Sequence, residues 1–236
     1  MQLHHEPASP SPLGPELAPP ASSWLACDHA DGLRELQRPG VNVVHWPRTL
    51  DPALADALAR LTPPKSEHDA QLHTTGDFEA DAARLLDASP WAGADLRAPL
   101  AADLTLLMRA FARVTEAHTF AARLEWVLGE KCPKLHVDHC RARLVTAYLG
   151  PGTCWAPNKD ARRNMLGAAS ARLCDPNAAI LPDPKTLQRA AAGDIVLMKG
   201  NAWPGEPNMG AIHRSPHADH AHFARLVLVL TTREAG

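Results

Sequence analysis

The chain has 236 residues, and 45% of them are hydrophobic, which is enough for one large domain with a sizeable core. Lys and Arg number 24 and Asp and Glu number 26, so the formal charge of −2 gives no argument for binding to nucleic acid. The sequence has no apolar run of the roughly 18 residues that a membrane-spanning helix needs, and we expect no membrane partner.

The N-terminal segment, residues 1–23, contains six Pro among Ser, Ala and Glu, a composition that predicts a disordered tail. It lacks the basic stretch followed by an apolar stretch of a secretory signal, so we expect a cytoplasmic protein. We predict that residues 24–236 form a single domain, in which a mainly helical part at 24–119 precedes a β-rich, metal-binding part at 120–236.

Three segments of the first half have helical patterns. DPALADALARL begins with Asp51 as an N-cap and Pro52 at the first helical position. GDFEADAARLLDAS predicts a second, short helix. ADLRAPLAADLTLLMRAFARVTEAH predicts the longest helix, and Pro99 is compatible with a helix that begins close to it. Its apolar residues recur at steps of three or four and predict a face packed on the core: Leu96, Leu100, Leu104, Leu107, Phe111 and Val114.

After residue 120 the pattern changes to short runs of β-forming residues. These runs are ARLEWVLG, RLVTAYLG, AGDIVLMKG and ARLVLVLTT, and connections rich in Pro and Gly separate them. A helical part followed by several short strands is typical of an α+β protein whose β part is a barrel or jelly roll.

The stretch CPKLHVDHC at 132–140 concentrates side chains that bind metals. His136 and Asp138 are two residues apart, so on a strand they point to the same face and can share one divalent ion, while His139 points away. His213 follows much later, next to another strand-like run. Two His and one carboxylate form the ligand set of non-haem Fe(II) oxygenases, which leaves coordination positions open for a co-substrate and O₂.

This order of residues, followed by Arg225 at the entry to the last strand, resembles the 2-oxoglutarate/Fe(II)-dependent dioxygenase superfamily. The resemblance spans residues 120–232. It implies a double-stranded β-helix core, which is a cupin-like jelly roll, with the helical N-terminal part packed on it. It also implies that the two His and the Asp bind Fe(II).

The same resemblance implies a binding site for 2-oxoglutarate. Arg225 would hold the carboxylate of this co-substrate through a bidentate pair, and Thr146 or Tyr148 would provide a hydroxyl partner. Arg141 and Arg143 flank the same strand and are alternatives to Arg225.

A closer resemblance covers most of the chain after the tail. CPKLHVDHCRARLVTAYLGPGTCW and the loop GNAWPGEPNMGAIHRSP look like segments of an uncharacterised bacterial family, domain-of-unknown-function 1826. This family implies no established activity.

Two further features leave alternatives open. Cys132, His139 and Cys140, together with the predicted iron ligands nearby, could bind Zn²⁺ through sulfur and nitrogen, although the spacing matches no usual zinc-finger pattern. The stretch HADHAH at 217–222 is either a metal-collecting loop or a surface turn.

Two aromatic residues lie in loops rich in Pro and Gly. Trp155 and Trp203 either line the mouth of a substrate site or fold back on the core.

The leading functional hypothesis is therefore a hydroxylase-type oxygenase that uses Fe(II) and 2-oxoglutarate on a small-molecule or otherwise unidentified substrate. One alternative is a non-catalytic, cupin-like metal-binding protein of zinc homeostasis, and another is a jelly-roll binding module without metal. The sequence does not determine the substrate, the choice among iron, zinc and manganese, or the oligomeric state.

Overall fold

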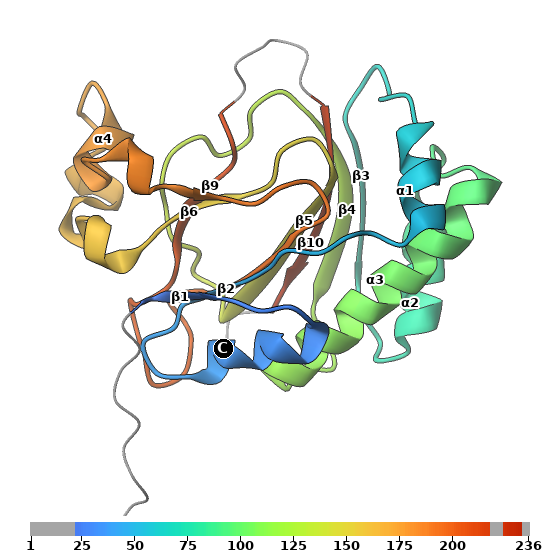
Figure 1. Cartoon of the computed structure of the whole chain (residues 1–236), viewed down its shortest axis with the longest axis horizontal. Coiled ribbons are helices and arrows are strands. Elements are labelled where there is room, and N and C mark those ends of the chain that lie inside the picture. Colours follow the sequence, from blue (N-terminus) through green and yellow to red (C-terminus); the bar gives the residue numbers. More distant parts are fainter. Residues whose placement is uncertain (1–21, 218–223, 233–236) are drawn as a thin grey trace, which may run out of the picture.

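The computed structural model describes residues 22–217 and 224–232, and nearly all of the tail predicted at 1–23 lies outside these residues (Figure 1). The described part contains a seven-stranded sheet of order β1-β2-β8-β5-β10-β4-β3 and a three-stranded sheet of order β7-β6-β9. The strands are β1 (Trp24–Ala26), β2 (Val43–Trp46), β3 (His68–His73), β4 (Ala121–Leu128), β5 (Ala142–Leu149), β6 (Cys154–Ala156), β7 (Gln188–Arg189), β8 (Ile195–Lys199), β9 (Ile212–Arg214) and β10 (Ala224–Thr231).

The helices complete the described part of the chain. The α-helices are α1 (Pro52–Ala59), α2 (Phe78–Asp87), α3 (Ala94–Thr115) and α4 (Pro176–Ile180). The 3₁₀ segments are η1 (Ala30–Gln37), η2 (Asn158–Asp160), η3 (Arg163–Met165), η4 (Gly167–Ala169) and η5 (Pro184–Thr186). None of the helices in the described ranges combines the length and the apolar character that crossing a membrane requires.

The four strand predictions of the second half are confirmed, but the description of residues 24–119 as mainly helical is incomplete. That part also supplies β1, β2 and β3, and β1 and β3 form the two edges of the large sheet. β3 pairs antiparallel with β4, and β2 pairs antiparallel with β8. These strands are short, and their backbone partners lie far away in sequence, so their local pattern is weak.

One face of the large sheet is covered by helices. Figure 1 shows α1, α2 and α3 grouped on one side of the sheet, and β6 and β9 on the other. The six apolar residues predicted to form the core-facing side of α3 are all buried, and they pack against Leu124, Trp126, Leu226 and Leu228 of the sheet. Full burial of each such side chain contributes roughly 1.5–3 kcal/mol.

Two helix starts illustrate how local sequence determines these elements. The Asp51 carboxylate accepts hydrogen bonds from the backbone N–H groups of Ala53 and Leu54, at 2.9 and 3.4 Å, and Pro52 occupies the first position of α1 as predicted. By contrast, α3 begins at Ala94, so Pro99 lies inside the helix. Its missing N–H leaves the carbonyl of Asp95 without the helical donor it would otherwise have.

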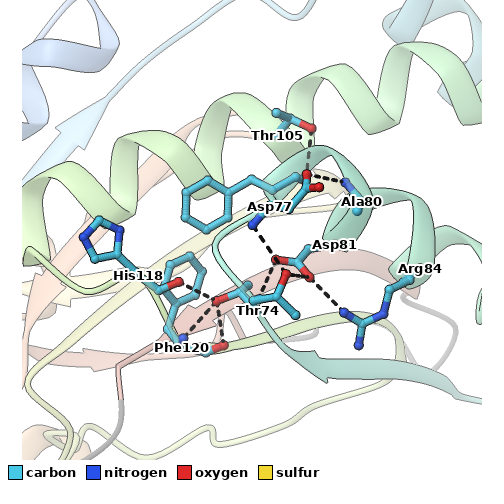
Figure 2. A network of polar contacts seen from close by, with 10 residues as sticks. Thr74, Asp77, Ala80, Asp81, Arg84, Thr105, His118 and Phe120 are labelled. Carbon is cyan, nitrogen blue, oxygen red and sulfur yellow. Dashed lines mark hydrogen bonds and ion pairs between the residues drawn. The ribbon is translucent and has the colours of Figure 1, made fainter.

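The start of α2 is tied to the sheet by a polar network (Figure 2). The fully buried Asp81 carboxylate accepts from the backbone N–H of Thr75 at 2.8 Å, from its hydroxyl at 3.1 Å, and from Arg84 at 2.9 Å. The hydroxyl of Thr74 accepts from the N–H of Phe120 at 2.9 Å, at the entry to β4. The network thus joins the end of β3, the start of α2 and the start of β4.

The opposite, inner face of the large sheet meets the smaller sheet. Val127, Val145 and Val227 of the large sheet pack there with Trp155 of β6. The ring of Trp155 also lies edge-on to Trp24, with ring centroids 5.7 Å apart. This inner apolar cluster covers only part of the face, and the polar side chains that remain on it form the site described below.

Candidate metal centre

Three side chains predicted to bind metal come together between the two sheets. His136, Asp138 and His213 each offer a ligand atom, and these atoms all lie within 4.8 Å of one another. Nε2 of His213 is 3.3 Å from Oδ2 of Asp138, and Nε2 of His136 is 3.9 Å from Oδ1 of the same carboxylate. The convergence expected from the sequence is therefore present.

The backbone of the site differs from the strand that we expected for residues 136–138. His136 forms an isolated β-bridge to His213 in β9, with N–H to carbonyl distances of 3.0 and 2.9 Å in the two directions. Asp138 lies beyond this bridge in irregular structure. Two backbone hydrogen bonds thus hold the two imidazoles side by side, and their ring centroids are 4.4 Å apart.

The loop that carries Asp138 lies directly against Gly200 at the end of β8. The N–H of Asn201 donates to the carbonyl of Asp138 at 2.8 Å. A Cβ atom at position 200 would lie 1.9 Å from the carbonyl oxygen of Cys140, so any side chain there would displace the loop. The absence of a side chain at Gly200 is therefore part of what places the carboxylate.

The hydrogen bonds of the two imidazoles determine which nitrogen faces the site. Nδ1 of His136 is 2.8 Å from the carbonyl of Lys134, and Nδ1 of His213 is 3.1 Å from the carbonyl of Ala211. A carbonyl can only accept, so Nδ1 carries the proton in both rings and Nε2 presents a lone pair. The Nε2 lone pairs of both rings then point toward the Asp138 carboxylate, and no proton lies between them.

This arrangement fits a divalent cation. Oδ2 of Asp138 is buried and has no hydrogen-bond partner among the described residues. Two imidazole lone pairs and a carboxylate repel one another unless a cation lies between them, and they are a ligand set for iron, zinc or manganese. Metal–ligand bonds are about 2 Å, so ligand atoms around one ion are at most roughly 4 Å apart, and side-chain shifts of under about 1 Å would close the group.

The pKa values of the ligands favour the metal-binding protonation states. Burial, followed by the proximity of His213, lowers the pKa of His136, which favours the neutral imidazole. Burial alone would raise the pKa of Asp138. The adjacent His213, with the nearby Arg143 and His136, outweighs burial and holds the Asp138 pKa below its usual value.

A cavity of about 100 Å³ lies beside the three ligands, and two arginines of the large sheet line it. Arg225 of β10 is 4% exposed, and its guanidinium donates to the hydroxyl of Ser215 at 3.4 Å. A Cβ atom at Gly150 would lie 2.7 Å from Cγ of Arg225, so this glycine, with φ of 76°, leaves the space for the Arg225 side chain. Arg143 of β5 donates to Oδ1 of Asp138 at 2.7 Å.

The expected hydroxyl partners of the co-substrate are on the wrong face of β5. Side chains alternate along a strand, so Thr146 and Tyr148 lie on the face opposite to Arg143. Tyr148 is buried in the helix-covered core and donates to Asp103 of α3 at 2.7 Å, and Asp103 also forms a bidentate pair with Arg48. Neither hydroxyl lines the cavity, and the prediction for these two residues is wrong.

The cysteines and His139 are not part of the three-residue group. His139 and Cys132 are exposed and Cys140 is buried, and within the described ranges the metal-capable group contains none of them. Cys132 does line the cavity. The geometry thus gives no support to a zinc site with thiolate ligands. In the HADHAH stretch, residues 218–222 lie outside the described residues.

The two tryptophans named from the sequence are packed in the interior. Trp155 is 1% exposed and belongs to the inner apolar cluster. Trp203 belongs to the helix-covered core, and the cations of Arg141 and Lys199 lie over its ring at 5.5 and 5.0 Å. Both fold back on the core and neither lines the cavity.

Sequence reasoning missed a group of charged residues on the same face. Arg123 and Glu125 of β4 and Lys131 line the cavity, and the nearly buried Glu125 pairs with Lys131 at 2.7 Å. The alternation in ARLEWVLG contains the signal, because Arg123 and Glu125 fall on the face opposite to Leu124 and Trp126.

Comparisons with solved structures find proteins of similar fold. The structure is similar to dioxygenase for auxin oxidation 1 from Arabidopsis thaliana in complex with 2-oxoglutarate, with a TM-score of 0.51 at 9% identity over 90% of this chain and 92% of that one. A rice dioxygenase for auxin oxidation gives a TM-score of 0.47 at 12% identity over 86% and 76% of the chains. The first likeness shows that the chain shares the fold of a dioxygenase.

The chain belongs to the family described as "Protein of unknown function (DUF1826)", whose model matches residues 27–231. None of the curated proteins compared with the sequence matches it. The resemblance to this family noted in the sequence is thus confirmed, and the resemblance to dioxygenases is confirmed for the fold.

Proposed function

We propose that this protein is an oxygenase that depends on Fe(II) and 2-oxoglutarate. One observation carries the proposal: two imidazoles and a carboxylate converge within 4.8 Å, and the two imidazoles line a cavity that Arg225 also lines. The likeness to a dioxygenase solved with 2-oxoglutarate supports it. In this proposal the two facing sheets are a variant of the double-stranded β-helix.

His136, Asp138 and His213 would hold the Fe(II) ion. When bound, the ion supplies activation of O₂: one oxygen atom enters the substrate as a hydroxyl, the other enters succinate, and 2-oxoglutarate loses CO₂. Three protein ligands would leave coordination positions of the ion for the co-substrate and O₂.

The chain's own residues would bind and orient the reactants. Arg225 would pair with the distal carboxylate of 2-oxoglutarate, because it is buried, lines the cavity and carries the planar guanidinium that pairs with carboxylates. Arg143 would hold Asp138 by its 2.7 Å bond to Oδ1, so that Oδ2 faces His213. The carbonyls of Lys134 and Ala211 keep each Nε2 free to bind the ion.

The test is formation of succinate from 2-oxoglutarate by anaerobically purified protein that is reloaded with Fe(II) and exposed to O₂. We expect slow succinate formation even without the primary substrate. Arg225→Gln should weaken 2-oxoglutarate binding by about 10- to 100-fold, in line with loss of a charged bidentate pair. The matched control is Arg109→Gln on α3, since Arg109 is exposed and pairs with Glu79 on the helix-covered side.

Zinc retained through purification, with no succinate formed under any loading condition, would overturn the oxygenase proposal. That outcome would favour a non-catalytic metal-binding protein. Unchanged 2-oxoglutarate affinity in Arg225→Gln would overturn the role of Arg225 alone.

A further inference from the structure

A second, larger cavity adjoins the one at the metal ligands. It has a volume of about 480 Å³, within the range of roughly 300–1,000 Å³ typical of small-molecule sites. Its lining comes from β3, the start of β4, and the inner faces of β5 and β10: Gln71, Leu72, His73, Ala121, Ala122, Arg123, Arg143, Val229 and Thr231. Arg123, Arg143 and Val229 line both cavities, so the two cavities are neighbours.

The smaller sheet leaves this part of the inner face open. The inner apolar cluster joins β6 and its neighbours to residues of β2, β4, β5, β8 and β10, and in the described ranges it takes no residue from β3. The edge strand β3 instead contributes Gln71 and His73 to the larger cavity. A molecule in this cavity would therefore lie beside the metal ligands without displacing packed core residues.

The surroundings of the metal ligands carry an excess of positive charge. Five cationic side chains and a single carboxylate, that of Glu125, line the smaller cavity: Arg123, Lys131, Arg143, Arg214 and Arg225. Fe(II) would add two positive charges, and 2-oxoglutarate would bring two negative charges. Even with the Asp138 carboxylate counted, an excess of positive charge from the protein would remain after both had bound, and it would attract a second anion.

Arg123 is the cation best placed to receive that anion, because it lines both cavities and its ion pairs are loose. Its guanidinium is 3.8 Å from Asp69 and 3.4 Å from Glu125, whereas Lys131 binds Glu125 at 2.7 Å. The Arg123 side chain is 41% exposed. One carboxylate is thus shared between two cations, and the tighter bond belongs to Lys131.

We propose that the larger cavity binds the primary substrate and that this substrate is a small organic anion. Its carboxylate or phosphate group would pair with Arg123, and the rest of the molecule would extend past Arg143 and Val229 toward the metal ligands. The proposal rests on the oxygenase function for its chemistry: a C–H bond of the anion becomes C–OH, while 2-oxoglutarate is oxidised to succinate and CO₂.

The experiment measures binding and not turnover, so it can fail independently of the oxygenase proposal. The full chain is loaded with Mn²⁺ and saturated with 2-oxoglutarate, and calorimetry measures the affinities of matched probes. The probes are carboxylic acids, phosphate monoesters and primary amides built on the same small carbon skeletons, such as benzoate, phenyl phosphate and benzamide. The acid and phosphate arms identify which anionic group is preferred.

We expect the anions to bind and the amides to bind far more weakly. Arg123→Gln should weaken anion binding by about tenfold or more, and Arg123→Lys should restore part of it. Asp69→Asn should strengthen anion binding a few-fold, because it removes a competing carboxylate. Since that variant gains binding, misfolding does not account for its effect. Arg109→Gln is the control with unchanged affinity.

Amides that bind as well as the acids would overturn the proposal, as would full anion affinity in Arg123→Gln. Absence of binding by every probe would overturn it too, provided that 2-oxoglutarate itself still binds. If 2-oxoglutarate does not bind the Mn²⁺-loaded protein, the oxygenase function fails first, and the substrate proposal fails with it.

Discussion

The two faces of strands β4 and β10 have opposite chemistry, although the same stretches of backbone build both. Toward the helices, Leu124 and Trp126 of β4 pair across the sheet with Leu228 and Leu226 of β10, all of them almost fully buried. Toward the smaller sheet, the same strands present Glu125 and Arg225, which are also almost fully buried.

Adjacent residues of one strand point to opposite faces, so one face stabilises the fold and the other carries the charged groups of the site. Apolar burial on the helix-covered face increases the free energy of unfolding. The inner face buries charges, which costs free energy unless the charges are paired, so its residues are poor sources of stability. Substitutions on the two faces should therefore affect different measurements, and the following predictions, from the largest expected effect to the smallest, test that separation.

Truncation of the helix-covered core should have the largest effect on stability. Phe111 of α3 is fully buried and lies edge-on to Phe120, with ring centroids 4.9 Å apart. Phe111→Ala should lower the free energy of unfolding by about 3–5 kcal/mol, measured by urea denaturation, with the metal content of the folded protein unchanged. Leu106→Ala on the same helix is the control, because Leu106 is 39% exposed. Equal losses in the two variants would contradict this account of the core.

The polar junction between α2 and the sheet should have the next largest effect. Asp81→Ala removes a fully buried carboxylate, so the N–H and the hydroxyl of Thr75 lose their hydrogen-bond acceptor. We expect a loss of about 2–3 kcal/mol in the free energy of unfolding. Glu79→Ala breaks an exposed ion pair nearby and should cost under about 0.5 kcal/mol. A loss for Asp81→Ala no larger than for Glu79→Ala would contradict the role of the network.

A smaller effect should come from the tyrosine that faces the helices. Tyr148→Phe removes one hydrogen bond to the Asp103 carboxylate and should lower the free energy of unfolding by about 1.5 kcal/mol. The affinity for 2-oxoglutarate should not change, since the Tyr148 side chain lies on the far face of β5. A tenfold weaker affinity, measured by titration of the metal-loaded protein, would instead place Tyr148 in the site.

The smallest effect concerns thiol reactivity and leaves stability untouched. Burial against the helix-covered core raises the pKa of Cys27 to about 11, whereas Cys132 at the inner cavity is exposed. The thiolate is the reactive form, so at pH 8 Cys27 should be alkylated on the order of a hundredfold more slowly than an exposed thiol, and its rate should rise as pH approaches 11. Peptide mass spectrometry after timed iodoacetamide treatment measures both rates. Equal rates would contradict the burial of Cys27.

Much of the fold follows from local sequence. The apolar period of α3 and the capping pair of α1 are strong signals, and β4, β5, β8 and β10 are long or apolar enough to be recognised. The edge strands β1 and β3 are not, because three and six residues with mixed exposure carry little periodicity and depend on distant partners.

The candidate site also has a part that the sequence predicts and a part that it does not. The order of His136, Asp138 and His213 was predictable because it follows the pattern of a known superfamily, whereas their placement depends on a backbone bridge between residues far apart in sequence. The face on which Thr146 and Tyr148 lie can be predicted from the sequence alone. Both are an odd number of positions from Arg143 on one strand, so they cannot share its face.

The central claim is that His136, Asp138 and His213 bind one metal ion, and metal content tests it most directly. The protein and its His213→Ala variant are reloaded anaerobically with Fe(II), desalted, and measured for iron per folded chain. His118→Ala is the control, because this histidine is exposed and lies outside the group. We predict about one ion per chain in the unmodified protein and in the control, and almost none in His213→Ala. Full iron content in His213→Ala would contradict the claim.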